Sequence, residues 1–212
     1  GQMTYEDDVI KVPVAALSAP DADQLQRALL KGTVEVKVVL DVVSQGDAVS
    51  GNVIAEIPGK TDEIVLIGGH LDSWDLGTGA IDDGAGIGIT VGAAKLILDL
   101  NKTPRRTIRI VMFGSEEVGL IGAKAYAKKY KDKLDKHIVG AESDFGAGKI
   151  WKFDTNFAPE KLFLAEAMHK VLEPLGIGRG DNNASGGPDI GPLRELGVPA
   201  VILSRRNTTQ HM

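Results

Sequence analysis

From residue 63 onward, short β-branched runs alternate with amphipathic stretches, and this alternation limits the chain to a small set of folds. Strands are expected at residues 34–43, 52–57, 63–68, 107–113, 137–141 and 198–204. Helices are expected at residues 22–30, 83–100, 117–130, 159–172 and 189–196, where apolar residues recur at spacings of three and four. The pattern predicts an α/β layered domain with a largely parallel sheet.

The first 45 residues differ from the rest of the chain. They contain Pro13, Pro20, one expected helix and one expected strand, and they lack the glycine-rich loops of the later part. We therefore expect two parts: residues 1–45, as a small lobe or an incomplete piece of one, and residues 46–212, as the main domain.

Composition excludes several classes of protein. The net charge of -5 argues against a nucleic-acid partner, because binding to phosphates favours a basic surface. A membrane span is not expected, since the most apolar stretch, residues 87–100, is interrupted by Lys95 and Asp99. No signal peptide is expected in this chain, because no basic stretch leads into an apolar core at its start. The chain has no cysteine, so a metal would have to bind to histidine and carboxylate side chains.

Polar residues that can carry chemistry follow three of the expected strands. His70 follows the first of these strands, Glu116 and Glu117 follow the second, and Asp144 follows the third. Asp82 comes twelve residues after His70, next to a second aspartate at the start of a helix. Taken alone, acids at a helix start are explained by capping of the helix.

The shared position of these residues favours a metal site instead. Parallel strands bring their carboxyl ends to one edge of a sheet, where ligands bind in open α/β folds. Several carboxylates beside one histidine would repel one another unless a cation compensated their charge. Imidazole and carboxylate ligands suit zinc, and a second, non-ligating glutamate could accept a proton from water. The implied chemistry is hydrolysis.

Four motifs together resemble the co-catalytic zinc aminopeptidase family. They are Gly69-His70-Leu71-Asp72-Ser73, Asp82-Asp83-Gly84, Ser115-Glu116-Glu117-Val118-Gly119 and Glu142-Ser143-Asp144. The string from His70 to Gly77 is most similar to the plasma glutamate carboxypeptidase branch, also called the carboxypeptidase Q branch. The resemblance covers residues 11 to about 204. It implies a three-layer αβα domain with a mixed sheet, preceded by part of a protease-associated insert.

The resemblance also implies a role for each residue around two zinc ions. His70 and Asp144 would bind one zinc, Glu117 the other, and Asp82 would bridge both. Asp72 would orient His70, as ligand histidines usually require. Glu116 would act as the general base.

Three further residues are weaker candidates. The family takes its last zinc ligand from a histidine beyond a Gly-Val-Pro strand, and His211 lies fourteen residues past Gly197 in such a string. His211 is either that ligand or a solvated residue near the end of the chain. Asp189, in a glycine-rich string, and Trp74, four residues past His70, are expected to contact substrate; the alternative for Trp74 is a packing role in its loop.

The expected function is a zinc-dependent exopeptidase acting on short peptides as an aminopeptidase, dipeptidase or carboxypeptidase. The alternative is a non-catalytic relative that binds ligands with an incomplete metal site. The resemblance suggests a secreted or periplasmic protein and allows a homodimer. Recognition of a peptide terminus requires a charged partner or polar clamp, and the sequence does not identify one.

Overall fold

The computed structural model describes residues 12–41, 43 and 46–206. The chain divides into two units, with the boundary between residues 49 and 50. Each unit is described by itself. None of the helices in the described part of the chain is long and apolar enough to cross a membrane.

The described residues of the N-terminal unit contain one helix, α1 (Ala19–Leu29). The helix begins at Ser18, whose Oγ accepts a hydrogen bond from the backbone N–H of Asp21 at 3.3 Å. The strand expected at residues 34–43 is wrong: the described residues of this range form no strand. They are almost all exposed and no neighbouring strand pairs with them, so β-branched side chains alone do not produce a sheet.

The second unit is built on a seven-stranded sheet with the order β1-β3-β2-β4-β7-β5-β6. The strands are β1 (Val53–Ile57), β2 (Thr61–His70), β3 (Arg106–Phe113), β4 (His137–Glu142), β5 (Ile150–Asn156), β6 (Gly178–Arg179) and β7 (Ala200–Arg205). Strands β3, β2, β4 and β7 are mutually parallel, whereas β1 and β5 run antiparallel to their neighbours β3 and β7. The expected mixed, largely parallel sheet is confirmed.

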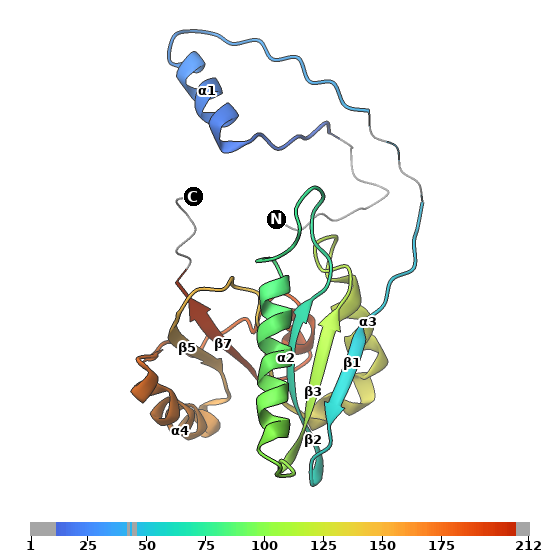
Figure 1. Cartoon of the computed structure of the whole chain (residues 1–212), viewed down its shortest axis with the longest axis vertical. Coiled ribbons are helices and arrows are strands. Elements are labelled where there is room, and N and C mark those ends of the chain that lie inside the picture. The colour runs from blue at the N-terminus through green and yellow to red at the C-terminus, as the bar shows by residue number, and fades with distance from the viewer. Residues whose placement is uncertain (1–11, 42, 44–45, 207–212) are drawn as a thin grey trace. The chain divides into compact units, whose positions relative to one another are not determined.

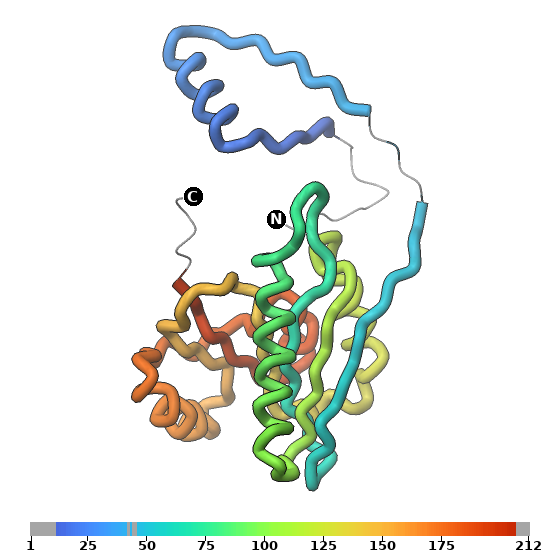
Figure 2. The backbone as a smooth tube through the Cα atoms, viewed as in Figure 1, coloured from blue at the N-terminus to red at the C-terminus, as the bar shows by residue number. Residues whose placement is uncertain are grey.

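Helices cover both faces of the sheet, as the expected three-layer fold requires (Figures 1 and 2). The helices are α2 (Gly84–Asp99), α3 (Ile121–Lys129), α4 (Leu162–Leu172) and α5 (Gly191–Glu195). Leu66 of β2 packs in one core cluster with Tyr126 of α3 and Leu193 of α5. On the opposite face, Ala94 of α2 packs with Ile110 of β3. Because both faces are buried, the central strands are mostly apolar and do not alternate strictly between apolar and polar residues.

The sequence did not predict β5 and β6. Strand β5 carries the charged residues Lys152 and Asp154, so its alternation is weaker than that of the central strands. β6 has only two residues, too few for a pattern. Both strands extend the sheet beyond β7.

The register of the central strands determines which residues lie side by side at the edge of the sheet where the site forms. His70 at the end of β2 lies beside Phe113 at the end of β3, and Gly68 lies beside Glu142 at the end of β4. The loops that follow these strands therefore start at one edge of the sheet.

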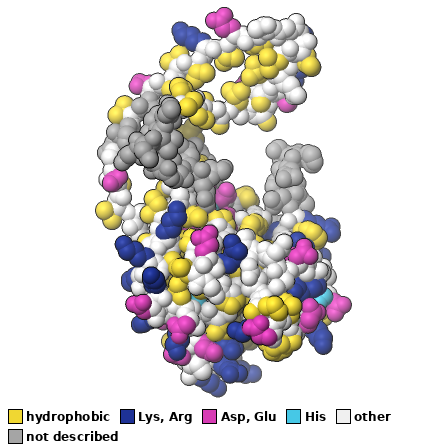
Figure 3. Space-filling model, turned by 180° about the vertical axis from the view of Figure 1, so that it is seen from behind, with side chains coloured by type: hydrophobic (Ala, Val, Ile, Leu, Met, Phe, Trp, Pro, Cys, Tyr) yellow, Lys and Arg dark blue, Asp and Glu magenta, His cyan; other side chains and the backbone are white. Residues whose placement is uncertain are grey.

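Figure 3 shows basic and acidic side chains interspersed on the face opposite to that of Figure 1.

Candidate metal centre

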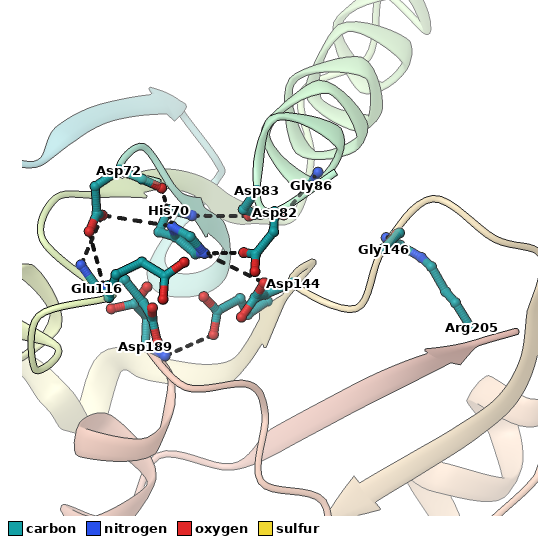
Figure 4. A network of polar contacts seen from close by, with 12 residues as sticks. His70, Asp72, Asp82, Asp83, Gly86, Glu116, Asp144, Gly146, Asp189 and Arg205 are labelled. Carbon is teal, nitrogen blue, oxygen red and sulfur yellow. Dashed lines mark hydrogen bonds and ion pairs between the residues drawn. The ribbon is translucent and has the colours of Figure 1, made fainter. Parts of the chain in front are cut away.

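His70 is buried at the centre of the site, with 1% of its surface exposed (Figure 4). Its Nδ1 lies 2.9 Å from the backbone carbonyl of Asp72; since a carbonyl only accepts, Nδ1 donates to it. Its Nε2 lies 3.0 Å from Asp82 Oδ1 and 3.5 Å from Asp144 Oδ1. Burial lowers the pKa of His70, but the hydrogen bond and charge of Asp144, together with the charges of Asp83 and Glu116, outweigh it and raise the pKa to about 10. The imidazole therefore holds a proton where a cation would bind.

The two adjacent aspartates have different roles. Asp83 is the N-cap of α2: its Oδ1 accepts from the N–H of Gly86 and its Oδ2 from the N–H of His70, both at 3.1 Å. A carboxylate oxygen of Asp83 also lies within 4.8 Å of ligand atoms of His70 and Asp144. Backbone N–H groups already engage both carboxylate oxygens of Asp83. Asp82 faces Nε2 of His70 and is therefore the better metal ligand of the two. Helix capping thus explains Asp83 but not its neighbour.

Gly86 allows α2 to start against the end of β4. A Cβ at this position would lie 1.7 Å from the carbonyl oxygen of Ser143 and 2.1 Å from Asp83 Oδ1. Only glycine permits this approach, which brings the Asp82 side of the helix start close to Asp144.

The Asp72 carboxylate has two partners besides His70, the residue that it was expected to orient. Its carboxylate Oδ1 accepts from the backbone N–H of Glu116 at 2.8 Å, and its Oδ2 accepts from that of Glu117 at 3.1 Å. The same carboxylate is 3.7 Å from Nδ1 of His70, so the backbone carbonyl of Asp72, rather than its side chain, orients His70. The Asp72 carboxylate therefore holds the two glutamates in addition to lying within ion-pair distance of His70.

Glu116 and Glu117 lie in a turn rather than at a helix start. The helix expected from residue 117 begins at Ile121, because Gly119 (φ +121°) and Leu120 (φ +59°) have backbone conformations outside the right-handed helical region. Glu116 is 4% exposed and Glu117 is half-buried. Ligand atoms of both glutamates lie within 4.8 Å of one another and of His70. The turn therefore brings both glutamates to the same side of the site as the histidine.

Asp189, which was expected to contact substrate, is fully buried in the structure. Its backbone N–H donates to Glu142 Oε2 at 2.8 Å, and neither of its own carboxylate oxygens has a hydrogen-bond donor among residues 12–41, 43 and 46–206. Burial, and then the charge of Asp189, raises the pKa of Glu142 well above its usual range. Burial also raises the pKa of Asp189 to about 7. The pair lies beneath the site, and its raised pKa values mean that it holds at least one proton near neutral pH.

Gly187 makes room for this pair. Its φ is +110°, and a Cβ would lie 2.2 Å from Glu142 Oε2. A side chain here would be strained by the backbone and would displace the Glu142 carboxyl group. The glycine-rich string around Asp189 is therefore explained by packing against Glu142.

The remaining two candidates lie away from these contacts. Trp74 is 44% exposed, in the loop after β2, and stays available for contact with a ligand. His211 lies outside the described residues.

The side chains present fit a divalent cation. One buried imidazole faces carboxylates from the ends of β2, β3 and β4, and Glu142 Oε1 and both Asp189 oxygens beneath them have no hydrogen-bond donor among the described residues. This excess of negative charge requires either bound protons or a cation. Nitrogen and oxygen ligands without thiolate suit zinc.

We expect the metal-free chain to lose stability as the pH rises from about 4 toward about 10. His70 with a pKa of about 10, and Asp83 and Asp189 with pKa values of about 7, all bind protons more tightly in the folded state than their ordinary values allow. Since the folded state then binds more protons than the unfolded state, the free energy of unfolding falls with rising pH.

Thermal melting in chelator at pH 5 and pH 8, at constant ionic strength, measures this dependence. A lower melting temperature at pH 8, by about 5 °C or more, is expected. Asp189→Asn, which removes one of the titrating groups, should weaken the dependence. A melting temperature that is constant or rises between these pH values would contradict the assignment of buried, protonated groups.

The chain is similar to known peptidases. The family model for peptidase family M28 matches residues 52–211. Carboxypeptidase Q of Xenopus laevis is 35% identical over 206 residues, covering 96% of this chain and 44% of the relative, and that of Homo sapiens is 33% identical over 206 residues, covering 96% and 43%.

Solved structures show the same similarity. The crystal structure of a peptidase M28 precursor from Shewanella amazonensis has a TM-score of 0.84 and 48% identity, covering 95% of this chain and 46% of that one. The aminopeptidase from Aneurinibacillus sp. strain AM-1 has a TM-score of 0.57 and 26% identity, and the match covers 74% of this chain and 39% of the aminopeptidase. This chain spans less than half the length of these relatives. By the matched family model and the identity to its relatives, the chain belongs to peptidase family M28.

Proposed function

We propose that this chain is a zinc-dependent exopeptidase that hydrolyses short peptides. The observation that carries the proposal is the Asp72 carboxylate, which holds the backbone of Glu116 and Glu117 beside His70. Two adjacent glutamates fixed next to a histidine and further carboxylates provide both metal ligands and a separate base. Family membership and the peptidase names of the relatives support the same chemistry.

Two zinc ions are part of the proposal. His70 and Asp144 would hold one ion, Glu117 would hold the other, and Asp82 would contribute to both. Zinc bound there supplies a Lewis acid and makes a water molecule acidic enough to attack near neutral pH. The second ion needs a further ligand, and His211 is the candidate from the sequence.

Glu116 is the proposed general base. Its backbone is fixed by Asp72, and its side chain is nearly excluded from solvent beside His70. From this position it takes a proton from the attacking water and passes it to the nitrogen of the leaving amine. Both transfers use one carboxyl group, so the residue returns to its starting state after each turnover.

Dipeptides with free ends are expected to be cleaved by the zinc-loaded chain, whereas the same peptides blocked at both ends are not. An exopeptidase recognises a charged terminus, and blocking removes that charge. Hydrolysis of each peptide is followed by chromatography of the products, with measured zinc content and with Glu116→Gln as the control for catalysis by this site.

The outcomes separate the two functions considered for this chain. Equal cleavage of free and blocked peptides would reject the exopeptidase. A zinc-loaded chain that cleaves none of them would favour the non-catalytic relative.

A further inference from the structure

The two glutamates of the metal centre lie in a turn that is closed at its base. Residues 114–122 lead from the end of β3 into the start of α3, and we call this segment the glutamate turn. The N–H of Gly122 donates to the carbonyl oxygen of Gly114 at 2.9 Å, which joins the two ends of the segment. The positions of Glu116 and Glu117 therefore depend on how these two ends are held.

One side chain from outside the turn binds both of its ends. Asn52 immediately precedes β1, the strand that pairs with β3. Its Oδ1 accepts a hydrogen bond from the N–H of Gly114 at 3.0 Å, and its Nδ2 donates to the carbonyl oxygen of Gly122 at 2.9 Å. A single planar amide thus supplies the acceptor for one end of the turn and the donor for the other.

Glycine at both ends of the turn permits this arrangement. A Cβ on Gly122 would lie 2.3 Å from Asn52 Oδ1, and a Cβ on Gly114 would lie 2.6 Å from the carbonyl oxygen of Gly51. A larger residue at either position would push the start of β1 away from the turn. Asn52 is half-buried, so water competes less for its two hydrogen bonds than it would at an exposed position.

The backbone of the turn has a conformation that must be held by its surroundings. Ser115 and Leu120 both have a φ of +59°, in the left-handed region that is unfavourable for residues with a side chain. The Asp72 carboxylate holds the turn from the side of the metal centre, through the N–H groups of the two glutamates. Asn52 holds it from the side of β1.

We propose that Asn52 is a positioning residue for the reaction at the metal centre. By joining the two ends of the glutamate turn, it keeps the carboxylates of Glu116 and Glu117 where one can bind metal and the other can accept a proton. Asn52 acts through the turn, because both ends of its amide are bound to backbone groups of the turn. The inference rests on the proposed peptidase function and adds to it a residue outside the motifs that carry the metal ligands.

The test is the hydrolysis of a dipeptide by Asn52→Ala, with the zinc content and the fraction of folded protein measured on the same sample. The value of kcat should fall about 10- to 100-fold at full zinc content, because a displacement of about 1 Å in a catalytic group has an effect of this order. KM should change by less than about threefold. A kcat equal to that of the unmodified chain would overturn the proposal.

Asn52→Asp separates the hydrogen bond from the volume of the side chain. Aspartate has nearly the same shape and can still accept from Gly114, but its carboxylate has no donor for the carbonyl oxygen of Gly122. We expect kcat to fall at least about fivefold in this variant as well. A kcat that falls in Asn52→Ala and is unchanged in Asn52→Asp would assign the effect to packing and overturn the proposed bridge.

Asn182→Ala is the matched control. The side chain of Asn182 makes a similar bridge in another loop: its Oδ1 accepts from the N–H of Phe157 at 3.0 Å, and its Nδ2 donates to the carbonyl oxygen of Phe157 at 2.8 Å. This variant should keep kcat within about twofold of the unmodified chain. An equal loss of kcat in Asn182→Ala and Asn52→Ala would assign the loss to general destabilisation and overturn the proposal.

Hydrogen exchange of the backbone amides provides a readout that needs neither zinc nor turnover. In metal-free Asn52→Ala, the amides of Glu116 and Glu117 should exchange at least about tenfold faster, whereas those of β2 and β4 should exchange as in the unmodified chain. This result supports the positioning role even if no peptide is cleaved and the proposed function fails. Unchanged exchange in the turn, or the same increase throughout the sheet, overturns it.

Discussion

Glu116→Gln is expected to lower kcat by about 100- to 10,000-fold while the zinc content stays the same. Glutamine has nearly the same shape as glutamate but cannot accept a proton from water. The backbone N–H of residue 116 still donates to Asp72, so the turn should keep its conformation. The measurement is steady-state hydrolysis of a dipeptide, with metal content determined on the same sample.

Glu117→Gln is the matched comparison, because Glu117 is the neighbouring residue and donates to the same carboxylate. Loss of the Glu117 carboxylate is expected to release zinc from one of the two positions, and the lower zinc content reduces the activity. Added zinc should therefore partly restore turnover. Added zinc should not restore turnover in Glu116→Gln. If Glu116→Gln remained nearly as active as the unmodified chain at full zinc content, the assignment of the base would be wrong, whereas the metal centre would stand.

Removal of zinc is expected to lower the melting temperature by about 8–16 °C. A ligand present at 1,000 times its dissociation constant stabilises the folded state by about 4.1 kcal/mol, and a unit of this size changes its melting temperature by about 2–4 °C per kcal/mol. The physical cause is the repulsion among the buried carboxylates near His70, which a cation removes. Differential scanning calorimetry with and without chelator, starting from metal-loaded protein, measures the change.

His70→Ala should abolish most of this difference, because His70 contacts both Asp82 and Asp144 in the site. His169→Ala is the matched control: His169 lies in α4, where its Nε2 contacts the backbone carbonyl of Ile177 at 3.1 Å. This variant should keep the full response to chelator. An unchanged melting temperature after verified removal of zinc from the unmodified chain would count against the metal centre.

Much of the fold could be predicted because the central strands combine apolar composition with glycine at their ends. β2, β3, β4 and β7 were expected within a few residues of their observed bounds. The failures have local causes. A strand at residues 34–43 would require a neighbouring strand to pair with, and no pattern in the sequence indicates one. Strand β5 forms despite its charged residues because it pairs with β7.

For the site, the sequence predicted which residues follow the strands but not how their side chains interact. The spacing from His70 to Asp82 and the adjacent pair Glu116-Glu117 can be recognised directly in the sequence. The partners of Asp72 are not, since its carboxylate contacts backbone N–H groups more than 40 residues away, which any residue type could provide.

The sequence by itself determined the layered α/β fold, the residues that follow the strands and the absence of thiolate ligands. Only the tertiary structure decided the depth and direction of each side chain. It buried Asp189 against Glu142 and separated the capping role of Asp83 from the position of Asp82. The physical reason is that periodicity along the chain reports which face of a strand or helix is buried, whereas contacts between distant loops depend on strand order and on close backbone approaches.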